Sequence, residues 1–99
     1  MITSQRKTKI VCTIGPSCYT QEGINNLLLH GMNVARINFS HGSYDIHKRS
    51  IKFIRKAARE FNYSIPVLAD LQGPKIRVGQ MKDDGQVLVE GSEITLTSD

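Results

Sequence analysis

Three short apolar segments, separated by two amphipathic segments, constrain the fold of this chain more than any other feature. They span residues 9–14, 33–39 and 65–71, and their starts recur about every 25–30 residues, which is the period of a βα unit. The first is rich in β-branched residues, which is typical of a strand buried on both faces of a parallel sheet. The sequence therefore predicts an α/β domain in which two helices connect three parallel strands by right-handed crossovers.

Two amphipathic helices are predicted between these strands. Thr20 and Ser43 stand where each helix would begin, and their hydroxyl oxygens can accept hydrogen bonds from free N–H groups of the first turn. Asp45 favours the first turn of the second helix through the helix dipole. Gly31 favours termination of the first helix. The apolar residues that share one face are Ile24, Leu27 and Leu28 in the first helix, and Ile51, Ile54, Ala58 and Phe61 in the second.

The second helix carries a basic face, and the net charge of the chain is +4. Such a balance suits a partner that bears phosphate, either a small molecule or a nucleic acid. We interpret the face as the solvated outer surface of an α/β layer, because no aromatic residues are interleaved with its charges. The basic residues are Lys48, Arg49, Lys52, Arg55, Lys56 and Arg59. The alternative, an RNA-binding accessory domain that uses this helix, predicts a salt-sensitive affinity.

Targeting signals and redox features are sparse in this sequence. It contains no run of about 18 apolar residues and no apolar segment after the N-terminal charges, so we expect no membrane partner and a cytoplasmic location. Cys12 and Cys18 do not have the spacing of metal ligands. We interpret Cys12 as a core residue; Cys18, in a loop, is either a core residue, which we favour, or a reactive thiol. His30 and His47 fall on the predicted helices and are expected at the surface.

The sequence pattern changes after Pro74. Short apolar segments at 76–78, 87–89 and 94–96 are separated by turn-forming residues, and no further helix is indicated. We therefore expect two parts, residues 1–74 as α/β and residues 75–99 as the start of an antiparallel β segment. Three parallel strands alone would leave open edges, so we expect the chain to be the front part of a larger α/β protein.

Three polar loops follow the three predicted strands. Because loops that follow parallel strands emerge on one rim of the sheet, their side chains are expected to converge there. The polar and turn-forming residues that these loops contribute are Thr13, Pro16, Ser17, Arg36, Asn38, Ser40, His41, Asp70, Gln72, Lys75 and Arg77.

The residue types at this rim indicate phosphate chemistry. Arginine forks match phosphate oxygens and lysine adds a compact charge, so Arg36, Lys75 and Arg77 would form an anion-binding site. Asn38, Ser40 and Asp70 offer hard oxygen ligands for a cation. Phosphoryl transfer depends mostly on positioning and charge neutralisation and hardly needs an acid–base pair. An alternative stays open, in which Arg36 pairs structurally with Asp70, while Asn38 and Ser40 only form a turn.

Three segments closely resemble, in order, the N-terminal motifs of the pyruvate kinase family. They are Lys7 to Ser17, Gly31 to Gly42 and Asp70 to Arg77, and the likeness extends from about residue 6 to residue 79. The resemblance implies a (β/α)8 TIM barrel with a β-barrel lid domain inserted after the third strand. It also implies transfer of the phosphoryl group from phosphoenolpyruvate to ADP, giving pyruvate and ATP in the last step of glycolysis, with Mg²⁺ required.

The same resemblance implies roles for individual residues. Arg36 corresponds to the catalytic contact with the substrate phosphoryl group. The family's nucleotide contacts correspond to Asn38, Phe39, Ser40, His41 and Arg77. Its monovalent-cation site corresponds to Asn38, Ser40, Asp70 and the carbonyl of Leu71. Potassium-dependent members tend to carry glutamate where this chain has Lys75; lysine there, with Leu71 and Gln72, marks potassium-independent ones, because a tethered ammonium can replace K⁺.

The resemblance also sets expectations for the complete protein. The family's catalytic lysine and Mg²⁺-binding acids would lie beyond residue 99, so we expect the 99-residue chain to be inactive alone. The complete protein is expected to be a homotetramer that binds phosphoenolpyruvate, pyruvate and ADP or ATP, and no nucleic acid. The alternative from another functional class is a non-catalytic phosphate- or nucleotide-binding α/β module, which predicts a cooperative melt shifted upward by ADP or ATP.

Overall fold

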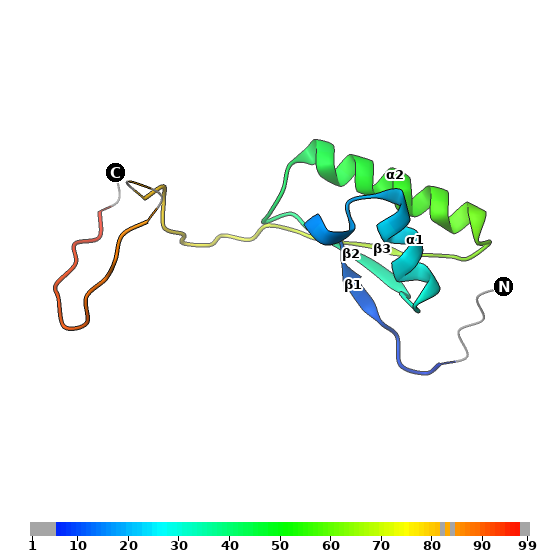
Figure 1. Cartoon of the computed structure of the whole chain (residues 1–99), viewed down its shortest axis with the longest axis horizontal. Coiled ribbons are helices and arrows are strands. Elements are labelled where there is room, and N and C mark those ends of the chain that lie inside the picture. The colour runs from blue at the N-terminus through cyan, green and yellow to red at the C-terminus, as the bar shows by residue number, and fades with distance from the viewer. Residues whose placement is uncertain (1–5, 82, 84, 98–99) are drawn as a thin grey trace.

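The computed structural model describes residues 6–81, 83 and 85–97, and Figure 1 shows a small α/β unit followed by an extended C-terminal segment. The strands are parallel, in the order β1-β2-β3, with the predicted alternation of strand and helix. The elements are β1 (Val11–Thr13), a 3-10 turn η1 (Pro16–Cys18), α1 (Gln21–Leu29), β2 (Val34–Asn38), α2 (Tyr44–Glu60) and β3 (Val67–Asp70). No described helix is long and apolar enough to cross a membrane.

Both predicted helix starts are confirmed. Thr20 accepts a hydrogen bond from the backbone N–H of Gly23 at 3.0 Å, and Ser43 accepts one from Ile46 at 3.4 Å. The first helix ends at Leu29, and Gly31 follows with φ of +105°, a left-handed conformation that glycine adopts without a Cβ clash. These caps fix where each loop enters its helix.

The strand β2 divides the sheet into two faces. Its side chains alternate, so Ala35 and Ile37 are buried under the helices while Arg36 and Asn38 point to the opposite face. Parallel strands joined in sequential order by right-handed crossovers place both helices on one face of the sheet, where α1 also contacts α2. The core on that face comprises Ile14, Cys18, Ile24, Leu28, Met32, Ala35, Ile37, Ile54, Ala57 and Ile65. Within residues 6–81, 83 and 85–97, the other face carries no helix.

The outer strands are less buried than predicted. The side chain of Val11 in β1 is 51% exposed and that of Leu68 in β3 is 44% exposed, whereas Cys12 is half-buried. Each of these strands has a neighbour on one side only, and one face of the sheet is uncovered. The expectation that the first strand is buried on both faces is therefore wrong for this chain.

The two histidines on the helices lie in different environments. His30 is exposed as predicted, and its Nδ1 is 2.8 Å from the carbonyl oxygen of Asn26. His47 is buried, with only 7% of its surface exposed, so the expectation that it lies at the surface is wrong. Its ring lies 4.8 Å from that of Phe39, measured between centroids, because the loop before α2 folds back over this helix.

The segment after β3 contains none of the predicted strands in its described residues. Figure 1 shows the chain leaving the sheet after β3 and doubling back near its end, where Glu90 and Gly91 form the predicted turn. The apolar side chains of Ile76, Val87 and Leu96 are almost fully exposed. A short hairpin needs a further strand or a packed face to be stable, and this segment has neither. The predicted turn at 83–85 lies partly outside the described residues.

Candidate functional site

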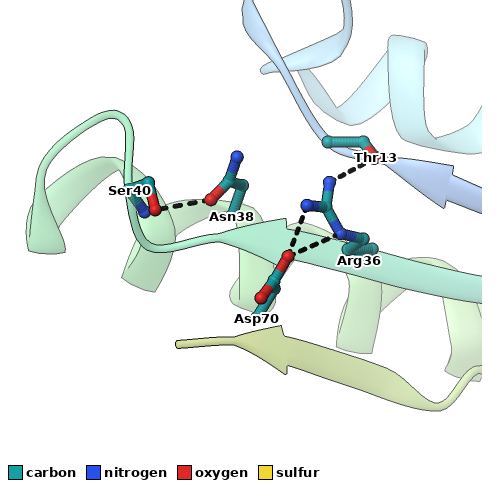
Figure 2. A network of polar contacts seen from close by, with 5 residues as sticks. All are labelled: Thr13, Arg36, Asn38, Ser40 and Asp70. Atoms are coloured by element: carbon teal, nitrogen blue, oxygen red, sulfur yellow. Dashed lines mark hydrogen bonds and ion pairs between the residues drawn. The ribbon is translucent and has the colours of Figure 1, made fainter. Parts of the chain in front are cut away.

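A cluster of polar side chains lies on the uncovered face of the sheet, at the carboxyl ends of the three strands (Figure 2). The strand register pairs Thr13 with Arg36 and Asn38 with Asp70. Since side chains two residues apart share a face, Arg36 and Asn38 lie side by side on β2. The predicted convergence of the three loops therefore holds for these four residues.

Arg36 is held from both neighbouring strands. Its Nε donates to Oδ2 of Asp70 at 3.1 Å, its Nη2 also pairs with that oxygen, and its Nη1 donates to Oγ1 of Thr13 at 2.8 Å. The structural pairing of Arg36 with Asp70 is therefore present. The side chains remain 30% and 44% exposed, respectively. A guanidinium has five N–H donors, so two of them remain available to an anion at this rim.

The loop after β2 is shaped by local hydrogen bonds. Oδ1 of Asn38 accepts from the backbone N–H of Ser40 at 3.0 Å, as Figure 2 shows, and the carbonyl of Asn38 accepts from His41 at 3.3 Å. The backbone N–H of Phe39 donates to the carbonyl of Asp70 at 3.0 Å, which ties the loop to β3. Asn38 and Ser40 therefore form a turn, which was one of the two predicted alternatives.

Several side-chain oxygen atoms lie near this turn. They come from the side chains of Asn38, Ser40 and Asp70, and only Oδ2 of the Asp70 carboxylate is used by Arg36. Leu71 follows Asp70 directly and is exposed. Divalent Mg²⁺ prefers carboxylates, but no cluster of three metal-binding His, Cys, Asp or Glu residues occurs in the described part of the chain.

A cavity of about 450 Å³ lies between the loops that follow β1 and β2. Its size is within the range of small-molecule sites, and its wall is mostly apolar with the polar side chains of Asn38 and His41 at one side. The lining residues are Thr13, Ile14, Gly15, Pro16, Tyr19, Asn38, His41, Gly42 and Ile46. Tyr19 and Ile46 were not predicted for the site, because apolar and aromatic residues next to helix starts also occur in ordinary cores.

Arg77 does not join this cluster. It lies on the segment that leaves the sheet, and it lines a separate depression of about 330 Å³ with other residues of the C-terminal segment, including Ile76 and Thr95. Lys75 lies on the same segment, is exposed and has no ion pair within the described ranges. Arg77 lies apart from the other rim residues in this structure. The convergence of Lys75 and Arg77 on the rim therefore stays a prediction.

Cys12 lies in β1 and Cys18 in η1, and their surroundings indicate a structural role. Cys18 is buried, and its Sγ lies 3.3 Å from the backbone nitrogen of Gly15, which it contacts as an acceptor. Burial raises the pKa of the Cys12 thiol above its ordinary value, and the neighbouring Cys18 adds to that rise. A raised pKa means less thiolate of Cys12 at neutral pH, and Cys18 is buried in the core, so the structure favours the core interpretation of both residues.

Known proteins resemble this chain over nearly its whole length. Pyruvate kinases of Staphylococcus epidermidis and Corynebacterium glutamicum are 51% identical over 92 residues and 47% identical over 94 residues. These alignments cover 93% and 95% of the chain, but only 16% and 20% of the relatives. The chain therefore spans about a fifth or less of the length of these relatives.

Solved structures agree with the sequence comparison. A crystal structure of pyruvate kinase from Cryptosporidium parvum superposes with a TM-score of 0.72 at 44% identity, covering 80% of this chain and 16% of that one. The pyruvate kinase of the same organism in complex with ADP gives a TM-score of 0.66 at 44% identity, covering 74% and 15%. A family model described as the barrel domain of pyruvate kinase matches residues 5–99. Together with the rim of polar residues on a parallel sheet, this match shows that the chain belongs to the pyruvate kinase family.

Proposed function

We propose that the protein to which these residues belong transfers the phosphoryl group of phosphoenolpyruvate to ADP, giving pyruvate and ATP. The observation that carries this proposal is the network of Thr13, Arg36 and Asp70 at the carboxyl rim of the sheet, in a chain that matches the family over residues 5–99. The 99-residue chain itself is expected to be inactive, because it provides only the first part of the barrel.

Arg36 is proposed to bind the phosphoryl group of phosphoenolpyruvate. Its guanidinium is oriented by Asp70 on one side and Thr13 on the other, and its two remaining N–H donors match the oxygens of a phosphate. Phosphoryl transfer gains most of its acceleration from positioning and charge neutralisation. An arginine fixed before substrate arrives would contribute to both.

The nucleotide is proposed to bind beside the loop after β2. The cavity there has Asn38 and His41 in its wall, and the residues between them, Phe39 and Ser40, belong to the same turn. The ADP complex of the relative from Cryptosporidium parvum supports a nucleotide as ligand of this family. Arg77 lies apart from this cavity, so its contact with the nucleotide requires a different placement of residues 75–99 from the one described here.

The division into a barrel part, residues 1–74, and the start of a β-rich lid domain, residues 75–99, is also a proposal. The end of β3 at Asp70 and the exposure of the apolar residues after it support a boundary near Pro74. The proposed lid strands would form when further strands pair with them. A homotetrameric assembly and a cytoplasmic location are predictions that rest on the family resemblance.

Two cations are proposed to assist the reaction. Mg²⁺ would neutralise phosphate charge when bound, and its ligands are expected beyond residue 99. Asn38, Ser40, Asp70 and the carbonyl of Leu71 would hold K⁺, since all four offer oxygen atoms. We propose that K⁺ is dispensable because the ammonium group of Lys75 can supply the same charge, once its segment lies against the rim.

Steady-state kinetics of the full-length protein test the proposed function. Pyruvate formation from phosphoenolpyruvate is followed through a coupled lactate dehydrogenase reaction, with and without ADP. We expect the wild-type protein to form pyruvate only when ADP is present. In Arg36→Met the turnover should fall about 100-fold or more, because the variant loses a preorganised charged contact to the transferred phosphoryl group. Arg49→Met, an exposed arginine of α2, is the matched control and should behave as wild type. ADP binding without pyruvate formation would instead support the non-catalytic module.

A further inference from the structure

His47 is buried without an evident role in the core. It is the fourth residue of α2, and it lies beside Phe39, which packs against the apolar core. Its ring packs against Phe39 with a centroid distance of 4.8 Å and an interplanar angle of 44°, a geometry typical of a favourable aromatic pair. Phe39 belongs to the loop of residues 38–42, which we name the second loop.

Gly42, at the other end of the second loop, also lies against His47. Its φ is +75°, and a Cβ atom built on it would lie 3.1 Å from Cε1 of the His47 ring, closer than an ordinary van der Waals contact. Gly42 therefore lies close to the edge of the ring at Cε1 and Nε2. His47 touches both sides of the turn that presents Asn38 and His41 to the cavity.

The contact is one of packing. Within the described residues, neither ring nitrogen of His47 has a hydrogen-bond or ion-pair partner. The ring lies against Phe39 and close to Gly42, and the three residues share the lining of a depression of about 250 Å³. Aromatic pairs of this kind contribute free energy beyond the area that they bury. Loss of the ring would remove the support beneath the second loop without removing any group that faces the cavity.

We propose that His47 is a positioning residue that holds the second loop in its nucleotide-binding conformation. The inference rests on the proposed function, because it concerns the affinity of the same site for a nucleoside diphosphate. It assigns a role to a residue that makes no contact with the cavity. The role is carried by ring packing and therefore does not require an imidazole.

The test compares three variants of the full-length protein, His47→Ala, His47→Phe and Ile54→Val. Ile54 is fully buried on the same helix and lies in the core between helices and sheet, so Ile54→Val weakens the helix packing without touching the second loop. Two quantities are measured: the Kd for ADP by titration calorimetry, and the KM values for ADP and phosphoenolpyruvate. Thermal melting reports general destabilisation.

We expect His47→Ala to raise the Kd and KM for ADP about two- to tenfold, the factor that corresponds to loss of an aromatic pair. The kcat and the KM for phosphoenolpyruvate should stay close to wild type. His47→Phe should recover most of the ADP affinity, and Ile54→Val should lower the melting temperature alone. Gly42→Ala should weaken ADP binding both because its φ of +75° strains any side chain and because its Cβ would crowd the ring. Only the crowding should disappear in the His47→Ala background, so the effect there should be smaller but not absent.

The outcomes separate the inference from the proposed function. Unchanged ADP affinity in His47→Ala, or an equal loss in His47→Phe, would overturn the positioning role even if the enzyme is active. A wild-type protein that binds ADP but forms no pyruvate would refute the proposed reaction, and the Kd values would still decide the role of His47. A wild-type protein that binds no ADP would refute both.

Discussion

Replacing Thr13 by valine isolates one of the contacts that orient Arg36. Valine has nearly the same shape as threonine and favours a strand equally, so β1 should be retained. The change removes only the hydroxyl oxygen that accepts from Nη1 of Arg36 at 2.8 Å. The guanidinium then keeps its contacts with Asp70 but loses the one that fixes Nη1.

The expected effect can be worked out from the exposure of this contact. A hydrogen bond to a charged group contributes about 1.5–3 kcal/mol, but solvent at this rim competes with it, since Arg36 is 30% exposed and Thr13 is exposed. A net loss of about 1 kcal/mol in the free energy of substrate binding corresponds to roughly a fivefold rise in the KM for phosphoenolpyruvate. The KM for ADP is measured in parallel, because Thr13 also lines the cavity proposed for the nucleotide.

The assay is the coupled measurement of pyruvate formation by the full-length protein, with thermal melting to exclude unfolding. Thr13→Ser is the matched control, because it keeps the hydroxyl acceptor while removing a methyl group. It should stay within about a factor of two of wild type. An unchanged or lowered KM for phosphoenolpyruvate in Thr13→Val would refute the reasoning, as would an equal loss in Thr13→Ser.

Three further predictions concern the core, the cations and the thiols. Ile54→Ala should lower the free energy of unfolding by about 2–4 kcal/mol, measured in urea, because Ile54 is fully buried and its truncation leaves a cavity; an effect below about 1 kcal/mol would contradict the packing described. Activity of the full-length protein should persist when K⁺ is replaced by tetramethylammonium, and a large loss would show that Lys75 does not replace the ion. Because the pKa of Cys12 is raised in the folded state, the stability it contributes is fully present below the ordinary thiol pKa of 9.0 and falls as the pH rises beyond it. The difference in melting temperature between wild type and Cys12→Ala should therefore be constant around neutral pH and shrink only at alkaline pH.

Much of the fold could be predicted from local patterns. The caps at Thr20 and Ser43, the turn at Gly31 and the order of strands and helices follow from chemistry within a few residues. The strands are shorter than the apolar segments that predicted them, because hydrogen-bonded pairing between strands stops where the neighbouring strand ends. The buried position of His47 could not be predicted, because it depends on a loop that folds back over its own helix.

The site was predictable only where the sheet itself places the residues. Thr13, Arg36, Asn38 and Asp70 stand at the ends of paired strands, so topology alone brings them together. Arg77 follows β3 by seven residues, and its place depends on contacts that the described residues do not supply. The same reason explains why the expected strands after Pro74 are absent from the described segment: their apolar side chains have no partner.

The alternation of side chains along β2 has a consequence for how this chain must fold. A pairing error of one residue between β2 and either neighbour would turn Arg36 toward the helices and Ile37 toward the rim. Such a slipped state would bury an arginine without a counter-ion, which is far costlier than any apolar mismatch. Arg36 therefore disfavours the mispaired sheet, and its replacement by a neutral side chain would make that state accessible.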